Sequence, residues 1–314
     1  MIIVDAHCDT VTKIMEERKG ENLFKNTCHF DLARAKAQGS FVQFFAAFID
    51  PIYSQAYALR RAIQIIDKLE REAQEYCDSL MLCNSYEDIE KAFSQGKVAG
   101  IKSIEGGEAL QGDIGVLRAF YRLGVRSICL TWNHRNEIAD GVADASSGGG
   151  LTPFGKQVIE EMNRLGMLVD VSHLSEKGFW DVIEASKQPI IASHSNSKAI
   201  CNHRRNLTDE QISAIKENGG VIGINLYPDF LNNSDKASMK DVIKHIEHIS
   251  SIGGDGILGI GADFDGIEVT PVDIQGVQHV NALINELLKL NYTENFVKCF
   301  AGVNFMRVIK QVIK

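Results

Sequence analysis

The sequence lacks the usual signals of nucleic-acid-binding and membrane-spanning proteins. Its 314 residues include 33 Lys or Arg and 41 Asp or Glu, a formal charge of −8, with no run of five basic residues. This charge argues against a nucleic-acid partner. The longest apolar stretch, residues 41–49, is interrupted by Gln43 and is about half the roughly 20 residues that a membrane helix needs. The N-terminus has no basic cluster and an acid at position 5, which favours a first strand over a signal peptide.

The cysteines lack the spacing of a metal or redox motif. There are seven, with no CxxC pair, and an odd number in a long chain favours reduced thiols and a cytoplasmic location. Apolar residues make up 45% of the chain and charged residues 24%, as in a globular protein with a large core. This composition argues against a disordered, collagen-like or coiled-coil protein.

Short apolar runs alternate with segments of helical period, which is the pattern of a parallel sheet built from βα units. Eight strands are predicted, at residues 2–8, 41–49, 98–104, 127–132, 167–172, 189–193, 221–226 and 257–262. Helices are predicted at residues 55–75, 113–123, 153–165, 175–186, 208–218, 240–252, 277–290 and from 293 onward. His245 and His248 are expected on a solvated helix face.

These elements predict an α/β protein, a (β/α)8 TIM barrel with helical insertions and an extra C-terminal helix. A chain of this length is long enough for two domains, but single barrels often reach about 250 residues or more. We expect residues 1–314 to form one domain, with an extended linker at 10–39 and a helical insertion at 50–96. The alternative is an open doubly wound sheet, although no GxGxxG motif follows the first strand.

Metal-binding side chains stand where several predicted strands end. They are His7 and Asp9, Glu105, His173, His194 and Asp263, in that order along the chain. In a TIM barrel the carboxyl ends of the strands meet at the active-site face. A divalent ion would neutralise such a buried set of imidazoles and carboxylates. The sequence therefore predicts a metal site.

The number of donors favours two ions. One catalytic zinc usually takes roughly three protein ligands, and this site offers five: His7, Asp9, Glu105, His173 and His194. A carboxylate shared between two ions can complete the coordination of both. Glu105 is the natural bridge because its strand lies apart from those of the histidines. Imidazole with carboxylate suits zinc, with manganese or iron as alternatives.

Asp263 is not needed as a metal ligand and is therefore interpreted as an acid–base group. A carboxylate beside an activated water can take its proton and pass it to a leaving amine. Alternatively, Asp263 is a further metal ligand, or Asp265, two residues on, exchanges roles with it.

In this combination the chain resembles the membrane (renal-type) dipeptidases, peptidase family M19, from residue 2 to about 270. The motifs that carry the resemblance are His7-x-Asp9, Glu105-Gly-Gly, Val-Ser-His173, Ser-His194-Ser, Arg204-Arg205-Asn206-Leu and Gly-x-Asp263-Phe-Asp-Gly. The resemblance implies an amidohydrolase-type barrel that hydrolyses dipeptides with two zinc ions. It also implies that His7 and Asp9 bind one zinc, that His173 and His194 bind the other, and that Glu105 bridges them.

The resemblance further implies roles around the substrate. Asp263 becomes the acid–base residue, and Arg205 binds the free carboxylate of the dipeptide, where Arg204 is the weaker candidate. Tyr227 resembles a substrate-pocket tyrosine. The chain departs from the mammalian enzymes at one point, because Trp132 stands where their carbonyl-polarising histidine is found. We interpret His134, two residues further on, as a candidate replacement.

The expected reaction is attack by a metal-bridging hydroxide on the peptide carbonyl, with zinc and His134 stabilising the oxyanion. The substrate is a small dipeptide, no nucleic acid or membrane partner is expected, and a homodimer is left open. Another amidohydrolase reaction, such as deacylation of an N-acyl amino acid or opening of a lactam or lactone, is the alternative. A non-enzymatic barrel would require a broken set of site residues, and all six are present.

Overall fold

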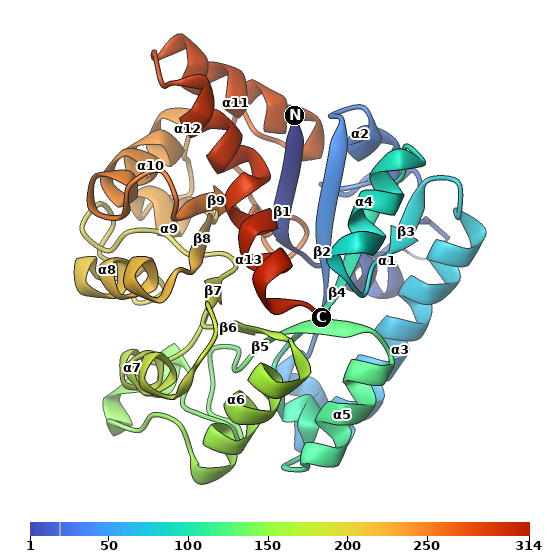
Figure 1. The fold of residues 1–314 in the computed structure, drawn as a ribbon, viewed down its shortest axis with the longest axis vertical. Helices are drawn as coiled ribbons and strands as arrows, with labels where there is room; N and C mark the ends of the chain where they lie inside the picture. The colour runs from blue at the N-terminus through green and yellow to red at the C-terminus, as the bar shows by residue number, and fades with distance from the viewer. Residues whose placement is uncertain (19) are drawn as a thin grey trace.

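Parallel strands form a closed barrel at the centre of the protein (Figure 1). The computed structural model describes residues 1–18 and 20–314. Within them, eight strands close the barrel in the order β1, β2, β4, β5, β6, β7, β8 and β9, and β9 pairs again with β1. The strands are β1 (Ile2–Cys8), β2 (Ser40–Phe48), β3 (Leu80–Leu82), β4 (Val98–Glu105), β5 (Val125–Cys129), β6 (Leu168–Asp170), β7 (Ile191–Ala192), β8 (Val221–Ile224) and β9 (Leu258–Ile260). The predicted TIM barrel is confirmed.

Helices surround the barrel and connect its strands. They are α1 (Thr10–Glu16), α2 (Leu32–Lys36), α3 (Ser54–Glu75), α4 (Tyr86–Ser94), α5 (Ile114–Arg122), α6 (Pro153–Leu165), α7 (Glu176–Ala185), α8 (Asp209–Asn218), α9 (Pro228–Asn232), α10 (Met239–Gly253), α11 (Val280–Lys289), α12 (Glu294–Lys298) and α13 (Asn304–Val312). Local signals set several boundaries. Thr208 and Gln211 form a reciprocal capping box at the start of α8, and Gly219 ends that helix in the left-handed region.

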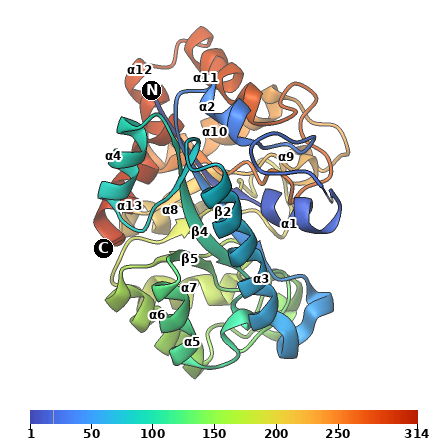
Figure 2. The same ribbon diagram turned by 90° about the vertical axis from the view of Figure 1, so that its right-hand side faces the viewer.

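The C-terminal helix α13 closes one end of the barrel. Its side chains Phe305 and Ile309 belong to the same buried apolar cluster as Val4, Val42 and Val221 from the strands. Figure 2 shows α13 on one side of the strands, and α1 and α9 on the opposite side. The end with α13 holds the amino ends of the strands, so the carboxyl ends open on the side of α1 and α9.

Two stretches differ from expectation. The predicted linker at residues 10–39 contains α1 and α2, because short apolar stretches there pack on the barrel. The predicted helical insertion also contains β3, which pairs with β4 from Leu80–Val98 to Leu82–Gly100, outside the closed barrel.

Strand β5 ends at Cys129, earlier than predicted, and leaves Trp132 in the following loop. Among the described helices, none is long and apolar enough to cross a membrane.

The expectation for His245 is wrong. Its side chain is fully buried, because α10 packs the face that carries Val242, His245 and Ile249 against the protein. Two backbone groups satisfy the imidazole there: the Ser197 N–H donates to Nδ1 at 3.1 Å, and Nε2 lies 2.9 Å from the Leu231 carbonyl oxygen. The helical pattern alone does not distinguish such a buried, fully bonded histidine from an exposed one.

Candidate metal centre

The six predicted site residues come together at the carboxyl ends of the strands. All are at least nine-tenths buried. Four of them line a cavity of about 400 Å³: Asp9, Glu105, His173 and Asp263. Phe48, Trp132, Tyr227 and Phe230 are among the side chains that form its other walls. The sequence interpretation that placed the site at this end of the barrel agrees with the structure.

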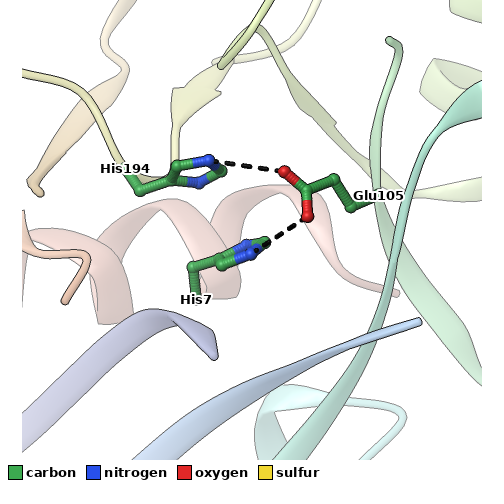
Figure 3. Close-up of side chains that lie close together, drawn as sticks. All are labelled: His7, Glu105 and His194. Atoms are coloured by element: carbon green, nitrogen blue, oxygen red, sulfur yellow. Dashed lines mark ion pairs between the residues drawn. The ribbon is translucent and has the colours of Figure 1, made fainter. Parts of the chain in front are cut away.

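Glu105 lies between two groups of histidines. Its Oε2 is 3.4 Å from Nε2 of His7, and its Oε1 is 3.5 Å from Nε2 of His194 (Figure 3). The same Oε1 is 3.0 Å from Nε2 of His173. Each carboxylate oxygen therefore serves a different side of the cluster. This is the geometry expected of a bridging ligand.

Two further carboxylates complete the side of His7. Asp9 Oδ2 is 3.1 Å and Asp263 Oδ1 3.8 Å from Nε2 of His7. The ligand atoms of His7, Asp9 and Asp263 form one compact group, and those of His7, Glu105 and His194 form another. Both groups are buried, and His7 belongs to each.

Burial and the neighbouring charges shift the pKa values of the residues in this cluster. Burial raises the pKa of Asp9 to about 7, against the opposing effect of His7. Burial also lowers the pKa of His173 to about 4, and Arg205 adds to this effect. For Glu105, burial raises the pKa, but the charge of His7 and hydrogen bonds from the histidines outweigh it, so the pKa lies well below its usual range. A neutral His173 beside an ionised Glu105 has the protonation states that metal ligands need.

The donor set fits divalent cations. Nε2 of His173 and Nε2 of His194 are only 2.8 Å apart, and two imidazole nitrogens this close need a proton or a cation between them. Oδ1 of Asp9 is buried and has no hydrogen-bond partner among residues 1–18 and 20–314. Because buried polar atoms are rarely left unpaired, this oxygen points to a missing ligand. His7, Asp9, Glu105, His173 and His194 are thus suited to hold two ions.

A second layer of residues orients these side chains, and sequence reasoning missed it. Asn133 Oδ1 lies 2.8 Å from Nδ1 of His173, and the Ser193 hydroxyl lies 2.7 Å from Nδ1 of His194. Ser193 in turn donates to Asp170. Such partners fix the tautomer of a metal-binding histidine. No motif in the sequence indicates that Asn133 and Ser193 contact the two histidines.

The backbone at the site is unusual at two functional positions. His173 and Asp263 adopt left-handed conformations, with φ of 66° and 60°. Non-glycine residues in this region are uncommon and cluster at functional sites. Asn225 donates from Nδ2 to Oδ2 of Asp263 at 2.9 Å and so fixes the carboxylate while Oδ1 faces His7.

The three predicted substrate residues have different positions. Tyr227 lines the main cavity, in an edge-to-face contact with Phe230. Arg205 is 5% exposed and lines a smaller cavity of about 40 Å³, which shares His173 with the main one. Its Nη2 donates to the His194 carbonyl at 3.2 Å, and its Nε has no partner in the part of the chain that the structure describes.

The structure does not bring His134 to the main cavity. The His134 side chain is 62% exposed and lines a separate surface groove with Asp50 and Arg135. The physical reason is that the chain leaves β5 at Cys129, so residues 130–134 form a loop in which alternation along a strand no longer applies. Asp265 is also accounted for, since it accepts hydrogen bonds from Thr10, His29 and Phe30.

Known proteins match the chain along its whole length. An uncharacterised dipeptidase of Schizosaccharomyces pombe is 34% identical over 332 residues, which cover 98% of this chain and 80% of that protein. The crystal structure of a family M19 metallopeptidase, dipeptidase AC, superimposes with a TM-score of 0.91 at 28% identity, covering 100% of this chain and 99% of the other.

A second solved structure carries a bound inhibitor. It is a metallopeptidase of Rhodobacter sphaeroides with a phosphinate mimic of the dipeptide L-Ala-D-Ala, similar at a TM-score of 0.89 and 27% identity over 99% of each chain. The family described as membrane dipeptidase, peptidase family M19, matches residues 1–314. With its barrel and its buried cluster of histidines and carboxylates, the chain belongs to the membrane dipeptidase family, peptidase family M19.

Proposed function

We propose that the protein is a metal-dependent dipeptidase that hydrolyses dipeptides with a free C-terminal carboxylate. The observation that carries the proposal is the position of Glu105, which turns one oxygen to His7 and the other to His173 and His194. A bridging carboxylate of this kind suits a pair of zinc ions. Family membership supports the same reaction class.

Five residues would hold the two ions. His7 and Asp9 would bind one ion, His173 and His194 would bind the other, and Glu105 would be shared. When bound, the ions lower the pKa of water at the site to near 7, so a hydroxide nucleophile exists at neutral pH.

Asp263 performs the proton transfers in this proposal. Its Oδ2 is occupied by the Asn225 amide, and its Oδ1 faces the ligand cluster and the cavity. Oδ1 therefore accepts the proton of the attacking water and returns it to the departing amine. Burial raises the pKa of Asp263, which makes it a better base than an exposed aspartate.

Arg205 provides the recognition of the substrate carboxylate. Its guanidinium is buried, its Nε has no partner among the described residues, and its Cζ is 5.5 Å from the centre of the Phe230 ring, which lines the main cavity. A carboxylate would satisfy the free donor and neutralise the buried charge. A substrate with an amidated or extended C-terminus would lack this ion pair.

A substrate panel with metal analysis tests the proposal. The panel contains L-Ala-L-Ala, L-Ala-D-Ala, their C-terminal amides and an N-acyl alanine, and metal content is measured by mass spectrometry on the same protein. We expect two ions per chain and hydrolysis of the free dipeptides only. Equal turnover of the amides would contradict the role of Arg205, and turnover of the N-acyl substrate alone would favour a deacylase.

The variant Asp263→Asn tests the acid–base role. We expect turnover to fall by at least about 10²-fold, because general acid–base catalysis is worth this much, while the metal content stays at the wild-type value. A variant that binds two ions and remains active would show that Asp263 is not the base. Loss of one ion would instead make Asp263 a ligand.

A further inference from the structure

The proposed reaction needs a donor for the scissile carbonyl oxygen, and the expected candidate is absent from the cavity. As the water oxygen bonds to the carbonyl carbon, negative charge develops on that oxygen. A fixed hydrogen-bond donor there lowers the barrier. His134, the residue interpreted for this role, lies in another groove. Trp132 packs edge-to-face on Phe48, and its ring centre is 6.0 Å from that of His173.

Asn133 follows Trp132 and lines the main cavity beside Glu105, His173 and Asp263. The orientation of its amide is determined by His173. In the proposed metal-bound site, Nε2 of His173, which lies 3.0 Å from Glu105 and 2.8 Å from His194, would hold an ion, so the proton of the ring belongs on Nδ1. Nδ1–H therefore donates to Asn133 Oδ1, at 2.8 Å.

This orientation leaves the Nδ2 group of Asn133 free. Across residues 1–18 and 20–314, the side chain of Asn133 makes its only hydrogen bond through Oδ1. Its two N–H donors have no partner among these residues, and Asn133 lines the cavity that Asp9, Glu105 and Asp263 also line.

The backbone around Asn133 is held rigidly, as a preorganised donor requires. The Asn133 carbonyl accepts the N–H of Ala143 at 2.8 Å. Gly141 approaches so closely that a Cβ at this position would collide with the Asn133 carbonyl. Arg135 and Asp140 form an ion pair within the same loop. A donor fixed in this way needs little reorganisation during the reaction.

We propose that Asn133 is a catalytic residue whose Nδ2–H donates to the carbonyl oxygen of the scissile peptide bond. This rests on the proposed dipeptidase function. The carbonyl π electrons move to the oxygen that Asn133 holds as water attacks, and Asp263 takes the proton of the water. When the oxyanion collapses, the C–N bond breaks and Asp263 protonates the amine, so one water and one dipeptide yield two amino acids.

Two substitutions separate this role from orientation of His173. Asn133→Asp keeps an oxygen for His173 Nδ1 but has no Nδ2–H, and Asn133→Ala removes the donor without adding charge. We expect kcat of both to fall by about 10²–10³-fold, the effect of one oxyanion donor, with a KM within a few-fold of wild type. Asn133→Asp keeps two ions per chain. His134→Ala, the exposed neighbour, is the control and keeps wild-type kcat.

A binding measurement gives a second readout that does not require turnover. By calorimetry, a phosphinate mimic of L-Ala-D-Ala should bind both variants at least about 10-fold more weakly, while alanine, a product, binds as to wild type. Wild-type kcat or phosphinate affinity in Asn133→Ala would overturn the proposal. So would a loss in Trp132→Phe equal to that in Asn133→Ala, which would transfer the role to the indole. If the dipeptidase proposal itself failed, wild type would leave every dipeptide intact.

Discussion

His245 joins the two segments that border the substrate-binding side of the cavity. It accepts the N–H of Ser197, in the loop that leads from His194 to Arg205, and contacts the carbonyl of Leu231, at the end of α9. Tyr227 and Phe230 lie at the start of α9 and within it. A single buried imidazole therefore connects the loop before Arg205, the proposed carboxylate-binding residue, to the helix that carries Phe230.

Replacement of His245 by leucine leaves two buried backbone groups unpaired, which costs about 1–3 kcal/mol each. We expect His245→Leu to unfold at lower urea concentration at pH 7.5. Burial lowers the pKa of His245 to about 4, whereas the unfolded chain has the ordinary value near 6.5. The advantage of wild type is therefore complete above pH 6.5 and shrinks as the pH falls towards 4.

Urea unfolding at pH 7.5, 6 and 4.5 measures this difference. His248→Gln, on the neighbouring turn, is the control because His248 is partly exposed and contacts Asp209. This variant should keep the pH dependence of wild type. A difference between wild type and His245→Leu that does not change with pH would contradict the buried neutral state of His245.

Single residues differ in how far the sequence reveals them. His7, Asp9, Glu105, His173, His194 and Asp263 were predictable because each follows a recognisable strand, and strand ends converge in a barrel. Asn133, Asn225 and His245 were not, because their partners lie 40, 38 and 48 positions away in the chain. A contact at such a separation leaves no local pattern.

At the scale of elements, strands β7, β8 and β9 approach one another unusually closely below the metal centre. A Cβ at Gly261, just after β9, would collide with the carbonyl oxygen of Ser193, just after β7, and one at Gly223 would collide with the same oxygen. Only glycine permits this packing, which places Ser193 beside Nδ1 of His194.

The variant Gly261→Ala should displace Ser193 and with it His194. We expect zinc affinity to fall by roughly 10–100-fold, as for loss of other outer partners of metal ligands, measured by competition with a chelator. Gly256→Ala is the matched control, because nothing lies within 4 Å of a Cβ at Gly256. Equal affinity of the two variants would show that the close approach does not matter to the site.

Elements also differ in predictability. The long strands β1, β2 and β4 were found almost to the residue, because apolar runs of seven to nine residues are unambiguous. By contrast, β3 has three residues and gains its structure from pairing with β4. The short helices α1 and α2 were taken for an extended linker, since one or two turns carry too little periodicity.

For the molecule as a whole, the metal centre is expected to contribute strongly to stability. Without ions, the carboxylates of Asp9, Glu105 and Asp263 lie close together in a buried region. Zinc at about 1,000 times its Kd should stabilise the folded state by about 4 kcal/mol, which for a chain of this size raises Tm by roughly 6 °C.

Differential scanning calorimetry of the chelator-treated protein, with and without zinc, tests this expectation. Calcium serves as the control because it prefers sites built of oxygen ligands alone, and we expect it to raise Tm less. An identical Tm with chelator and with zinc would contradict a stabilising metal site.

The pairing of β1 with β9 has a consequence for synthesis of the protein. His7 and Asp9 leave the ribosome first, and Asp263 follows roughly 250 residues later. At about 5–20 residues per second, this interval lasts roughly 12–50 s. During that time the first ligands have no barrel around them. We therefore expect the newborn chain to complete its site at the end of translation or afterwards, when the pairing of β1 with β9 brings Asp263 to His7.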